Sequence, residues 1–263
     1  MIDLGLVGRR ALVAGAGHRP PRPGIGRTAA LALAEGGARV ACVDLDAGRA
    51  TAVAEEIGAA GGEAIAVVAD LRERSDATRA VREVVDAFGG LDIVVDIIGE
   101  ARWGSVLDFT DEDWDWSHAT NLRQAFLLLQ ASANQMVRQA TGGAMVVVSS
   151  VDGLFAATNH VAYGAAKAGL LSLVKTFAQE LGEHAIRVNA VLPGAVGIDV
   201  PDDEQPIYGG PVQPLRHPTK YDIAKALVFF VSDLAVGISG QSLPVDGGAS
   251  IKTPWSSTVP GRS

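Results

Sequence analysis

The sequence predicts a single α/β domain in which a doubly wound parallel sheet of about seven strands carries helices on both faces. Apolar runs bounded by glycine or charge recur along the 263 residues, and stretches with helical periodicity separate them. Most of these runs are continuous rather than alternating, as is typical of strands covered on both faces. Strand–helix alternation with right-handed crossovers makes such a sheet parallel.

The seven predicted strands are RALVAG (10–15), RVACVD (39–44), AIAVVAD (64–70), DIVVDIIG (92–99), AMVVVSS (144–150), IRVNAVLPG (186–194) and QSLPVDGG (241–248). Helices are predicted between them at 26–36, 47–60, 75–88, 111–138, 161–184 and 221–234. The fourth helix has a clear start, because Thr110 can cap it and the acidic residues that follow complement its dipole.

Composition excludes several classes of protein. The formal net charge is −8 with no long basic run, which makes a nucleic-acid partner improbable. No apolar run is long enough to span a bilayer, and the first residues resemble a strand leading into glycines rather than a signal peptide. Cys42 is the only cysteine, which excludes an internal disulfide, and its apolar surroundings predict a buried thiol. We expect a cytoplasmic protein with no membrane segment and no metal site.

Glycines directly after the first strand predict a dinucleotide site. In AGAGHRPPRPGIGR (14–27), Gly15 and the corner Gly24-Ile25-Gly26 join that strand to a helix. Glycine lets the backbone approach a ligand closely, and the N-terminus of a helix favours a pyrophosphate.

An insert, HRPPRP, separates these glycines. Its three prolines lack N–H donors and cannot cradle a phosphate, so we expect the insert to arch outward. Arg19 or Arg22 could fold back onto the phosphates, because a guanidinium group matches them in geometry. Two solvated arginines on a stiff surface loop are an equally good interpretation.

Acidic residues end the second and third strands. Asp44 lies 18 residues after Gly26, where a carboxylate can accept both ribose hydroxyls of an adenosine and would repel a 2′-phosphate. The sequence therefore favours NAD over NADP, although an insert arginine at the 2′ position would make NADP tolerable. The alternative for Asp44 is a cap on the helix at 47–60. Asp70, followed by Leu71, could flank the adenine or be a turn residue.

The strongest chemical signal lies in VSSVDGLFAATNHVAYGAAK (148–167). Tyr163 and Lys167 are four residues apart and share one helical face. A lysine ammonium group one turn away, together with a nicotinamide cation, would lower the pKa of the tyrosine and let it exchange a proton with a substrate oxygen. Ser150, at the end of a strand, could donate a hydrogen bond to the same oxygen.

On these residues the chain resembles the short-chain dehydrogenase/reductase family over essentially its full length, which implies a Rossmann-like sheet. Further matches are Thr120-Asn121-Leu122, Arg187-Val-Asn-Ala190, Pro193-Gly194 and Val245-Asp246-Gly247-Gly248.

The resemblance implies a role for each of these residues. Asn121, Ser150, Tyr163 and Lys167 would form a catalytic tetrad in which Asn121 holds a water that links Lys167 to solvent. Lys167 would also bind the nicotinamide ribose, the cofactor would contact Gly99, and the turn Pro193-Gly194-Ala195-Val196 would face the nicotinamide. The resemblance further implies hydride transfer between a secondary alcohol or ketone and the cofactor, and a homotetramer.

The sequence departs from the family's pattern at three places. The glycine loop is five residues longer, the usual Asn-Asn-Ala-Gly is Asp96-Ile97-Ile98-Gly99, and Ile198 replaces a threonine after the Pro-Gly turn. Asp96 lacks the donors of asparagine, which calls into question the usual brace between the central strands and the cofactor contact there. None of these changes touches the tetrad, and we expect an active enzyme.

Within the single domain over 1–263, we expect a cofactor half at roughly 1–140, a catalytic and substrate half at roughly 141–250 and a tail at 251–263. The Pro- and Gly-rich segment 199–220 is placed to act as a lid over substrate. Candidate pocket walls, which could equally be core or interface residues, are Trp103, Leu154, Phe155 and Tyr208. His160 could touch substrate, but a surface histidine is the favoured interpretation.

The leading substrate expectation is a hydroxysteroid or another alicyclic alcohol. A 3-oxoacyl thioester of CoA or acyl carrier protein is the second, and the acidic lid weighs against the carrier protein. A nucleotide-sensing scaffold without turnover is the alternative from another class, and the complete tetrad argues against it.

Overall fold

The computed structural model describes residues 3–18, 24–196 and 215–251. Arg19, Arg22 and the three prolines of the insert lie outside the described residues, as do Ile198, Tyr208, most of the expected lid and all but the first residue of the expected tail. Predictions about those residues therefore stay predictions.

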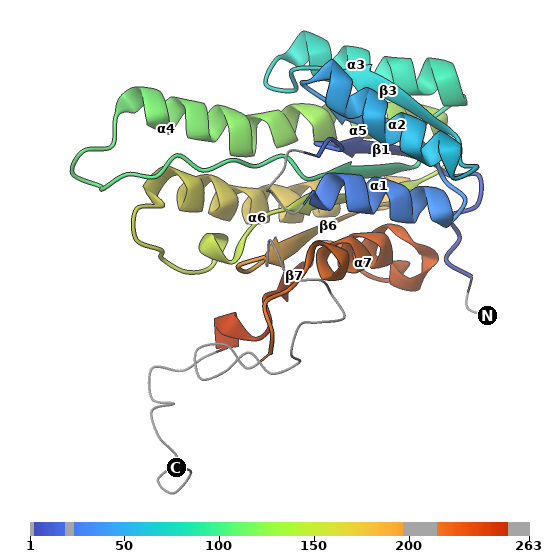
Figure 1. Cartoon of the computed structure of the whole chain (residues 1–263). Coiled ribbons are helices and arrows are strands. Elements are labelled where there is room, and N and C mark those ends of the chain that lie inside the picture. The colour runs from blue at the N-terminus through green and yellow to red at the C-terminus, as the bar shows by residue number, and fades with distance from the viewer. Residues whose placement is uncertain (1–2, 19–23, 197–214, 252–263) are drawn as a thin grey trace, which may run out of the picture.

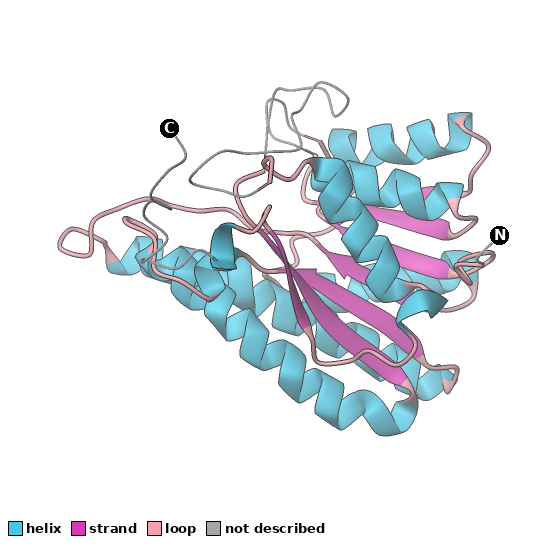
Figure 2. Ribbon diagram, turned by 90° about the horizontal axis from the view of Figure 1, so that it is seen from below, coloured by secondary structure: helices cyan, strands magenta, loops and turns pink. Residues whose placement is uncertain are grey.

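Seven parallel strands form one sheet in the order β3-β2-β1-β4-β5-β6-β7 (Figure 2). Their bounds are β1 Arg10–Ala14, β2 Arg39–Asp44, β3 Ala64–Val68, β4 Ile93–Asp96, β5 Gly143–Val148, β6 Ile186–Pro193 and β7 Ser242–Val245. The strand order reverses between β1 and β4, where the chain crosses from one half of the sheet to the other. In open α/β sheets, ligands bind at the carboxyl ends of the strands beside such a reversal. The expected fold is confirmed.

Helices cover both faces of the sheet. The main helices are α1 Ile25–Glu35, α2 Ala47–Ala59, α3 Arg74–Phe88, α4 Asp111–His118, α5 Gln124–Gln139, α6 Val161–Leu181 and α7 Lys220–Val231. Helices α1 and α7 lie side by side on one face, and they share a buried core with α2. Helices α3, α5 and α6 line the core of the opposite face (Figure 1).

Side chains of β1 show how the sheet separates the two cores. Leu12 and Ala14 belong to the core under α3, α5 and α6, whereas Ala11 and Val13 belong to the core under α1, α2 and α7. Because successive side chains of a strand point to opposite faces, both sets must be apolar when both faces are covered. This arrangement explains the continuous apolar runs of the sequence. Cys42 is buried in the second of these cores, as predicted.

The single helix predicted over 111–138 is wrong in one respect. Thr110 caps its start as predicted, since its side chain accepts a hydrogen bond from the Asp113 amide at 3.1 Å. The helix then changes to a π-helical segment at Ala119–Arg123 before it continues as α5. A π-helical turn contains one more residue than an α-helical turn, and such turns are frequent at functional sites. None of the described helices is long and apolar enough to cross a membrane.

An ion pair joins the first residue of β1 to Asp92, the residue just before β4. The Arg10 side chain donates to both carboxylate oxygens of Asp92, with Nε–Oδ2 at 2.7 Å and an Nη atom 2.5 Å from Oδ1. The Arg10 backbone amide adds a third bond to Asp92 Oδ2 at 2.9 Å. Burial opposes ionisation of Asp92, but its bonds to Arg10 outweigh that effect, so the pKa of this carboxyl is lowered.

We expect Asp92→Asn to reduce the free energy of unfolding by about 2 kcal/mol at pH 7, because hydrogen bonds to a charged group contribute roughly 1.5–3 kcal/mol. Urea unfolding measures the change. The folded-state pKa of Asp92 lies below its unfolded value, so its contribution is present above about pH 4 and is lost as the pH falls. The difference between wild type and variant should therefore narrow in acid, and a difference independent of pH would contradict this assignment.

Candidate active site

The glycine loop after β1 is built for close backbone approach. Gly15 has a φ of +76° and Gly24 a φ of +64°, in the left-handed region that favours glycine. A Cβ atom on Gly26 would lie 1.8 Å from the Gly15 carbonyl oxygen, so no side chain can be accommodated there. Gly24 directly precedes α1, which begins at Ile25. This loop leaves the first amides of α1 available to a phosphate, and the residues present therefore fit a dinucleotide.

Asp44 lies at the carboxyl end of β2, against this loop. Its Oδ2 accepts a hydrogen bond from the Gly17 amide at 3.1 Å, and a Cβ on Gly17 would lie 2.5 Å from the same oxygen. The interpretation of Asp44 as a helix cap is wrong. Asp46 caps α2 instead, because its side chain accepts from the Arg49 amide at 3.0 Å. Asp44 is therefore placed beside the predicted pyrophosphate site.

Asp70 and Leu71 follow β3 and have structural partners. The Arg72 guanidinium group donates to both oxygens of the Asp70 carboxylate, at 2.8 and 2.6 Å, and this pairing lowers the pKa of Asp70. The Leu71 side chain is buried in the core under α3. Both contacts agree with the turn-residue alternative, and a contact with the adenine stays a prediction.

Ser150 and Tyr163 meet in a pocket of about 490 Å³ at the carboxyl end of the sheet. Ser150 follows β5, and its Oγ accepts a hydrogen bond from the Asp152 amide at 3.1 Å. Burial raises the pKa of Tyr163 to about 12, the Asp152 charge adds to the rise, and a hydrogen bond with Ser150 opposes it. The pocket also includes Gly99 and Gly194.

Lys167 is fully buried one helical turn after Tyr163. Its Nζ donates to the carbonyl oxygen of Val148 at 2.9 Å and lies 3.5 Å from that of Ile98. The same Nζ is 5.5 Å from the centroid of the Tyr163 ring. Among the protein's own residues, burial dominates and raises the pKa of the phenol, and the lowering expected from Lys167 together with a nicotinamide cation stays a prediction.

Gly99 allows Lys167 and Asn121 to approach the same point of the backbone. A Cβ on Gly99 would lie 2.7 Å from Lys167 Nζ and 3.3 Å from Asn121 Oδ1. Asn121 is in the π-helical segment, and its side chain pairs with the backbone of Glu100, accepting at 3.0 Å and donating at 2.8 Å. The structure thus brings the four predicted residues close together: Ser150, Tyr163, Lys167 and, through the backbone at Gly99 and Glu100, Asn121.

Asp96 forms a side-chain brace, although not the brace between the central strands that the family's pattern implies. Its Oδ2 accepts a hydrogen bond from Gln124 Nε2 at 3.0 Å, which ties β4 to the first residue of α5. Its Oδ1 accepts from the Ile98 amide at 3.2 Å. The central strands remain paired through their backbones, with Asp96 opposite Ala14 and Val147. The side-chain bonds described for Asp96 thus run to α5 and to its own chain segment and not between the central strands, because a carboxylate accepts hydrogen bonds and Gln124 supplies a donor.

The turn after β6 closes the other side of the pocket. The Gly194 amide donates to the Val245 carbonyl at 3.1 Å, and a Cβ on Gly194 would lie 2.8 Å from the Asp246 Cβ. Val196 packs against the core under α1 and α7. Pro193 ends β6, so this turn is anchored to the sheet close to Tyr163.

His160 lies in the pocket, and the favoured interpretation of it as a surface residue is wrong. Its side chain is 19% exposed, its Nδ1 is hydrogen-bonded to Asp152, and its ring centroid is 3.8 Å from that of Trp103. Sequence reasoning missed Asp152 and Glu100 as pocket residues. Their positions, two residues after Ser150 and one after Gly99, were the signal that could have identified them.

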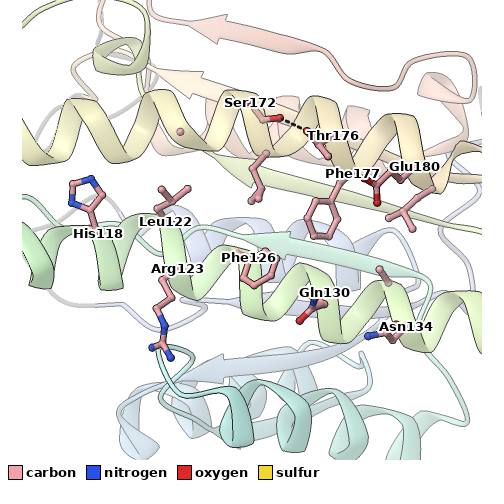
Figure 3. Close-up of a pocket in the computed structure, with 14 residues that line it drawn as sticks. His118, Leu122, Arg123, Phe126, Gln130, Asn134, Ser172, Thr176, Phe177 and Glu180 are labelled. Carbon is pink, nitrogen blue, oxygen red and sulfur yellow. Dashed lines mark hydrogen bonds between the residues drawn. The ribbon is translucent and has the colours of Figure 1, made fainter.

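A larger groove of about 880 Å³ lies elsewhere, between the π-helical segment with α5 and the outer part of α6 (Figure 3). Phe126 faces Phe177 across it, and Leu122 lies against Gly169 of α6. It contains none of the four tetrad residues. The candidate active site is therefore the smaller pocket, because Ser150 and Tyr163 meet there.

Comparison with known proteins agrees with this geometry. A family model described as enoyl-(acyl carrier protein) reductase matches residues 21–250. The L-rhamnose 1-dehydrogenase (NAD(P)(+)) of Azotobacter vinelandii is 39% identical, over 92% of this chain and 97% of the relative. The chain belongs to the short-chain dehydrogenase/reductase family. It is an oxidoreductase of alcohols with a nicotinamide cofactor.

Two further relatives show the breadth of the family around this chain. The 3-oxoacyl-(acyl-carrier-protein) reductase of Staphylococcus aureus is 36% identical, over 91% of this chain and 97% of the relative. A solved structure of a short-chain type dehydrogenase/reductase from Mycobacterium marinum aligns with a TM-score of 0.85 at 29% identity. That alignment covers 95% of this chain and 98% of the other.

We expect Gly99→Ala to lower kcat/KM roughly 10- to 100-fold, because a displacement of about 1 Å at a catalytic group has a cost of that size. The added methyl group would push Lys167 Nζ from its place. Gly58→Ala is a matched control, since no atom lies within 4 Å of the added Cβ. Steady-state rates of both variants provide the measurement, and equal rates would show that Gly99 does not position Lys167.

Proposed function

We propose that the chain is an NAD-preferring dehydrogenase in which Tyr163 exchanges a proton with the substrate oxygen. Ser150 would orient that oxygen, Lys167 would bind the nicotinamide ribose and favour the phenolate, and Asn121 would complete a proton relay to solvent. The convergence of Ser150 and Tyr163 in one pocket, with Lys167 buried behind them, is the observation that carries this proposal.

The cofactor supplies the hydride chemistry, and in its oxidised form a positive charge that favours the Tyr163 phenolate. The protein's own residues raise the pKa of Tyr163 to about 12, mainly through burial, so this phenol is protonated at neutral pH in the protein alone. Tyr163 must be deprotonated to accept a proton from the alcohol, so its ionisation depends on the positive charge that the oxidised cofactor brings next to it. Proton transfer is therefore coupled to cofactor binding.

Preference for NAD is supported by the position of Asp44. Its carboxylate lies against Gly17 of the glycine loop, where it can accept hydrogen bonds from ribose hydroxyls. A 2′-phosphate at the same place would meet a like charge. Arg49 is the nearby cation: its Cβ lies against Gly17, and its guanidinium group is paired with Asp46 at 3.4 Å.

A cyclic secondary alcohol that carries additional hydroxyl groups is the substrate class that the pocket supports best. Asp152, His160 and Glu100 give the pocket polar walls. Trp103, a residue that is 64% exposed, adds an aromatic ring. Acidic and imidazole groups suit neutral hydroxyls better than an anionic substrate. The name of the Azotobacter vinelandii relative, a sugar dehydrogenase, agrees with this class.

A 3-oxoacyl thioester is the second candidate, favoured by the exposed apolar side chains beside the pocket. Val106 and Phe155 line an adjoining hollow of about 440 Å³ that shares Asp152 and His160 with the catalytic pocket. An acyl chain would fit such a surface, and the Staphylococcus aureus relative carries that activity in its name. The acidic walls weigh against a partner as acidic as acyl carrier protein.

The homotetramer and the cytoplasmic location expected from the sequence stay proposals. The groove between α5 and α6 supports an oligomer, because Phe126, Leu173 and Phe177 give it an apolar lining that a second copy of the chain could cover. Burial raises the pKa of the Cys42 thiol to about 12, which makes it a structural and unreactive thiol.

We expect NAD-linked oxidation of cyclic polyols and sugars to exceed that of simple cyclic alcohols, sterols and acyl-CoA substrates. Nicotinamide absorbance across such a panel measures it. In the same panel Tyr163→Phe should lower kcat about 100-fold or more, as loss of a general acid–base group does, while cofactor binding persists. Turnover unaffected by Tyr163→Phe would favour the nucleotide-sensing alternative, and best turnover with 3-oxoacyl-CoA would favour the second candidate.

Replacement of the carboxylate at the end of β2 tests the choice of cofactor. We expect Asp44→Ala to raise the KM for NAD about tenfold or more, the cost of losing hydrogen bonds to a charged group, and to improve the use of NADP. Asp46→Asn is the control, because asparagine caps a helix as well as aspartate does. A ratio of NAD to NADP activity that stays unchanged in Asp44→Ala would contradict the proposed preference.

A further inference from the structure

Asp96 is a buried carboxylate that the proposed chemistry does not use. It ends β4 in the middle of the sheet and is 2% exposed. Its hydrogen-bond donors are neutral, namely the Gln124 side chain and the Ile98 amide. An ionised carboxylate in such a place is costly unless an opposite charge compensates it. The question is which cation that would be.

Lys167 is the cation that the geometry provides. Lys167 is 1% exposed. Both Lys167 and Asp96 contact the backbone of Ile98: the Ile98 amide donates to Asp96 Oδ1, and the Ile98 carbonyl oxygen lies 3.5 Å from Lys167 Nζ. The other described acceptor of Lys167 is the Val148 carbonyl. None of the ion pairs found among the described residues includes Lys167, so the interaction between the Asp96 and Lys167 charges acts at longer range than a direct ion pair.

Asp96 also holds the backbone on which the rest of the site depends. Gln124, which donates to it, is the first residue after the π-helical segment that contains Asn121. Asn121 in turn pairs with the backbone of Glu100. The chain from 96 to 100 is thus fixed at both ends by one helical element, and Lys167 contacts it between them. Displacement of either end would move the acceptor of the lysine.

The other charged groups of the site are farther along the pocket. On the same helix as Lys167, the Tyr163 ring faces it. In the short turn after β5, Asp152 faces Tyr163 and is paired with His160. Glu100 lines the pocket beyond Gly99. Around Asp96 itself, β1, β5 and α5 contribute Ala14, Val147 and Gln124, which carry no charge.

We propose that Asp96 is a positioning residue, the buried counter-charge that keeps the Lys167 ammonium group in place and ionised behind Tyr163. The aspartate that replaces the family's asparagine at position 96 would then supply a charge to the site of this chain. Asp96 touches neither substrate nor Tyr163 and acts only through Lys167 and the backbone at Ile98.

The titration of both groups agrees with this pairing. Burial raises the pKa of Asp96 to about 6, and the bonds from Gln124 and Ile98 together with the Lys167 charge limit that rise. Burial lowers the pKa of Lys167 to about 8, and the Asp96 charge limits that fall. Between about pH 6 and pH 8 both groups are charged, and outside this range the pair loses one of its charges.

Asp96→Asn removes the charge while a hydrogen-bonded brace can remain. The Gln124 Oε1 atom is buried and has no hydrogen-bond partner, so rotation of the Gln124 amide would let it accept from the new asparagine while Ile98 still donates to the asparagine oxygen. The variant therefore separates charge from packing.

The test is the pH dependence of Tm in four proteins without added cofactor: wild type, Asp96→Asn, Lys167→Met and the double variant. A group whose folded-state pKa is raised contributes stability at low pH and loses it as the pH rises through that value. The Tm of wild type relative to Asp96→Asn should therefore fall as the pH rises from about 4 through about 6. In the Lys167→Met background the same fall should occur at higher pH, since Asp96 has lost its counter-charge.

An identical midpoint in both backgrounds would overturn the proposal, as would a Tm difference independent of pH. Asp92→Asn is the matched control, a second carboxylate next to β4 whose effect should change only in acid and should not respond to Lys167→Met. This readout needs no turnover, so its failure is distinguishable from failure of the proposed function.

The pH profile of kcat/KM provides the second measurement. Loss of the Asp96 charge should let the pKa of Lys167 fall, which weakens support for the phenolate and raises the apparent pKa of Tyr163. The rising limb for oxidation and the falling limb for reduction should both move to higher pH in Asp96→Asn. A merely structural role would scale the rates and leave both midpoints where they are, which would overturn the proposal.

Discussion

Burial of the Lys167 ammonium group is the constraint on which the rest of this structure depends. A full charge is buried where α6 meets the carboxyl end of the sheet, and burial penalises its charged form. Its surroundings compensate that cost with two backbone carbonyls, from Val148 and Ile98, and with the carboxylate of Asp96 at longer range. Elements from both halves of the chain must therefore be in place before this group can be stable.

The sheet topology explains how these elements meet. Strands β4 and β5 are neighbours, so the segments that follow them leave the same edge of the sheet side by side. One carries Gly99 and Glu100, and the other carries Ser150 and Asp152. Helix α6 then returns over β6, and Lys167 reaches the end of β5 at Val148 and the segment after β4 at Ile98. The site is a property of this crossing and not of any single segment.

Much of this arrangement could be predicted from the sequence. Continuous apolar runs specified the sheet because strands covered on both faces need apolar side chains throughout. Spacing placed Tyr163 and Lys167 on one face of a helix, and the glycines identified the cofactor loop. Local patterns of this kind depend on residues close together in the chain, and such patterns are read reliably from a single sequence.

Features that depend on distant partners could not be read in this way. The π-helical segment leaves no mark in the apolar periodicity, and its Asn121 pairs with the backbone of Glu100, 21 residues earlier in the chain. The place of His160 depends on Asp152 and Trp103, and the role of Asp96 on Gln124, which is 28 residues away. The direction of the Tyr163 pKa also depends on how deeply the fold buries the phenol, which spacing does not reveal.

The extra residue in the π-helical turn acts as a phase shift between α4 and α5. An α-helix turns about 100° per residue, so one additional residue rotates everything before it by about that angle relative to everything after it. The positions of α4 that face inward and those of α5 that face inward therefore do not follow one continuous α-helical repeat, although the sequence runs from one helix to the other without a break. Shortening this turn by a single residue would preserve helix content and composition while redirecting a whole helix, so the length of the chain here is as much a part of the design as its chemistry.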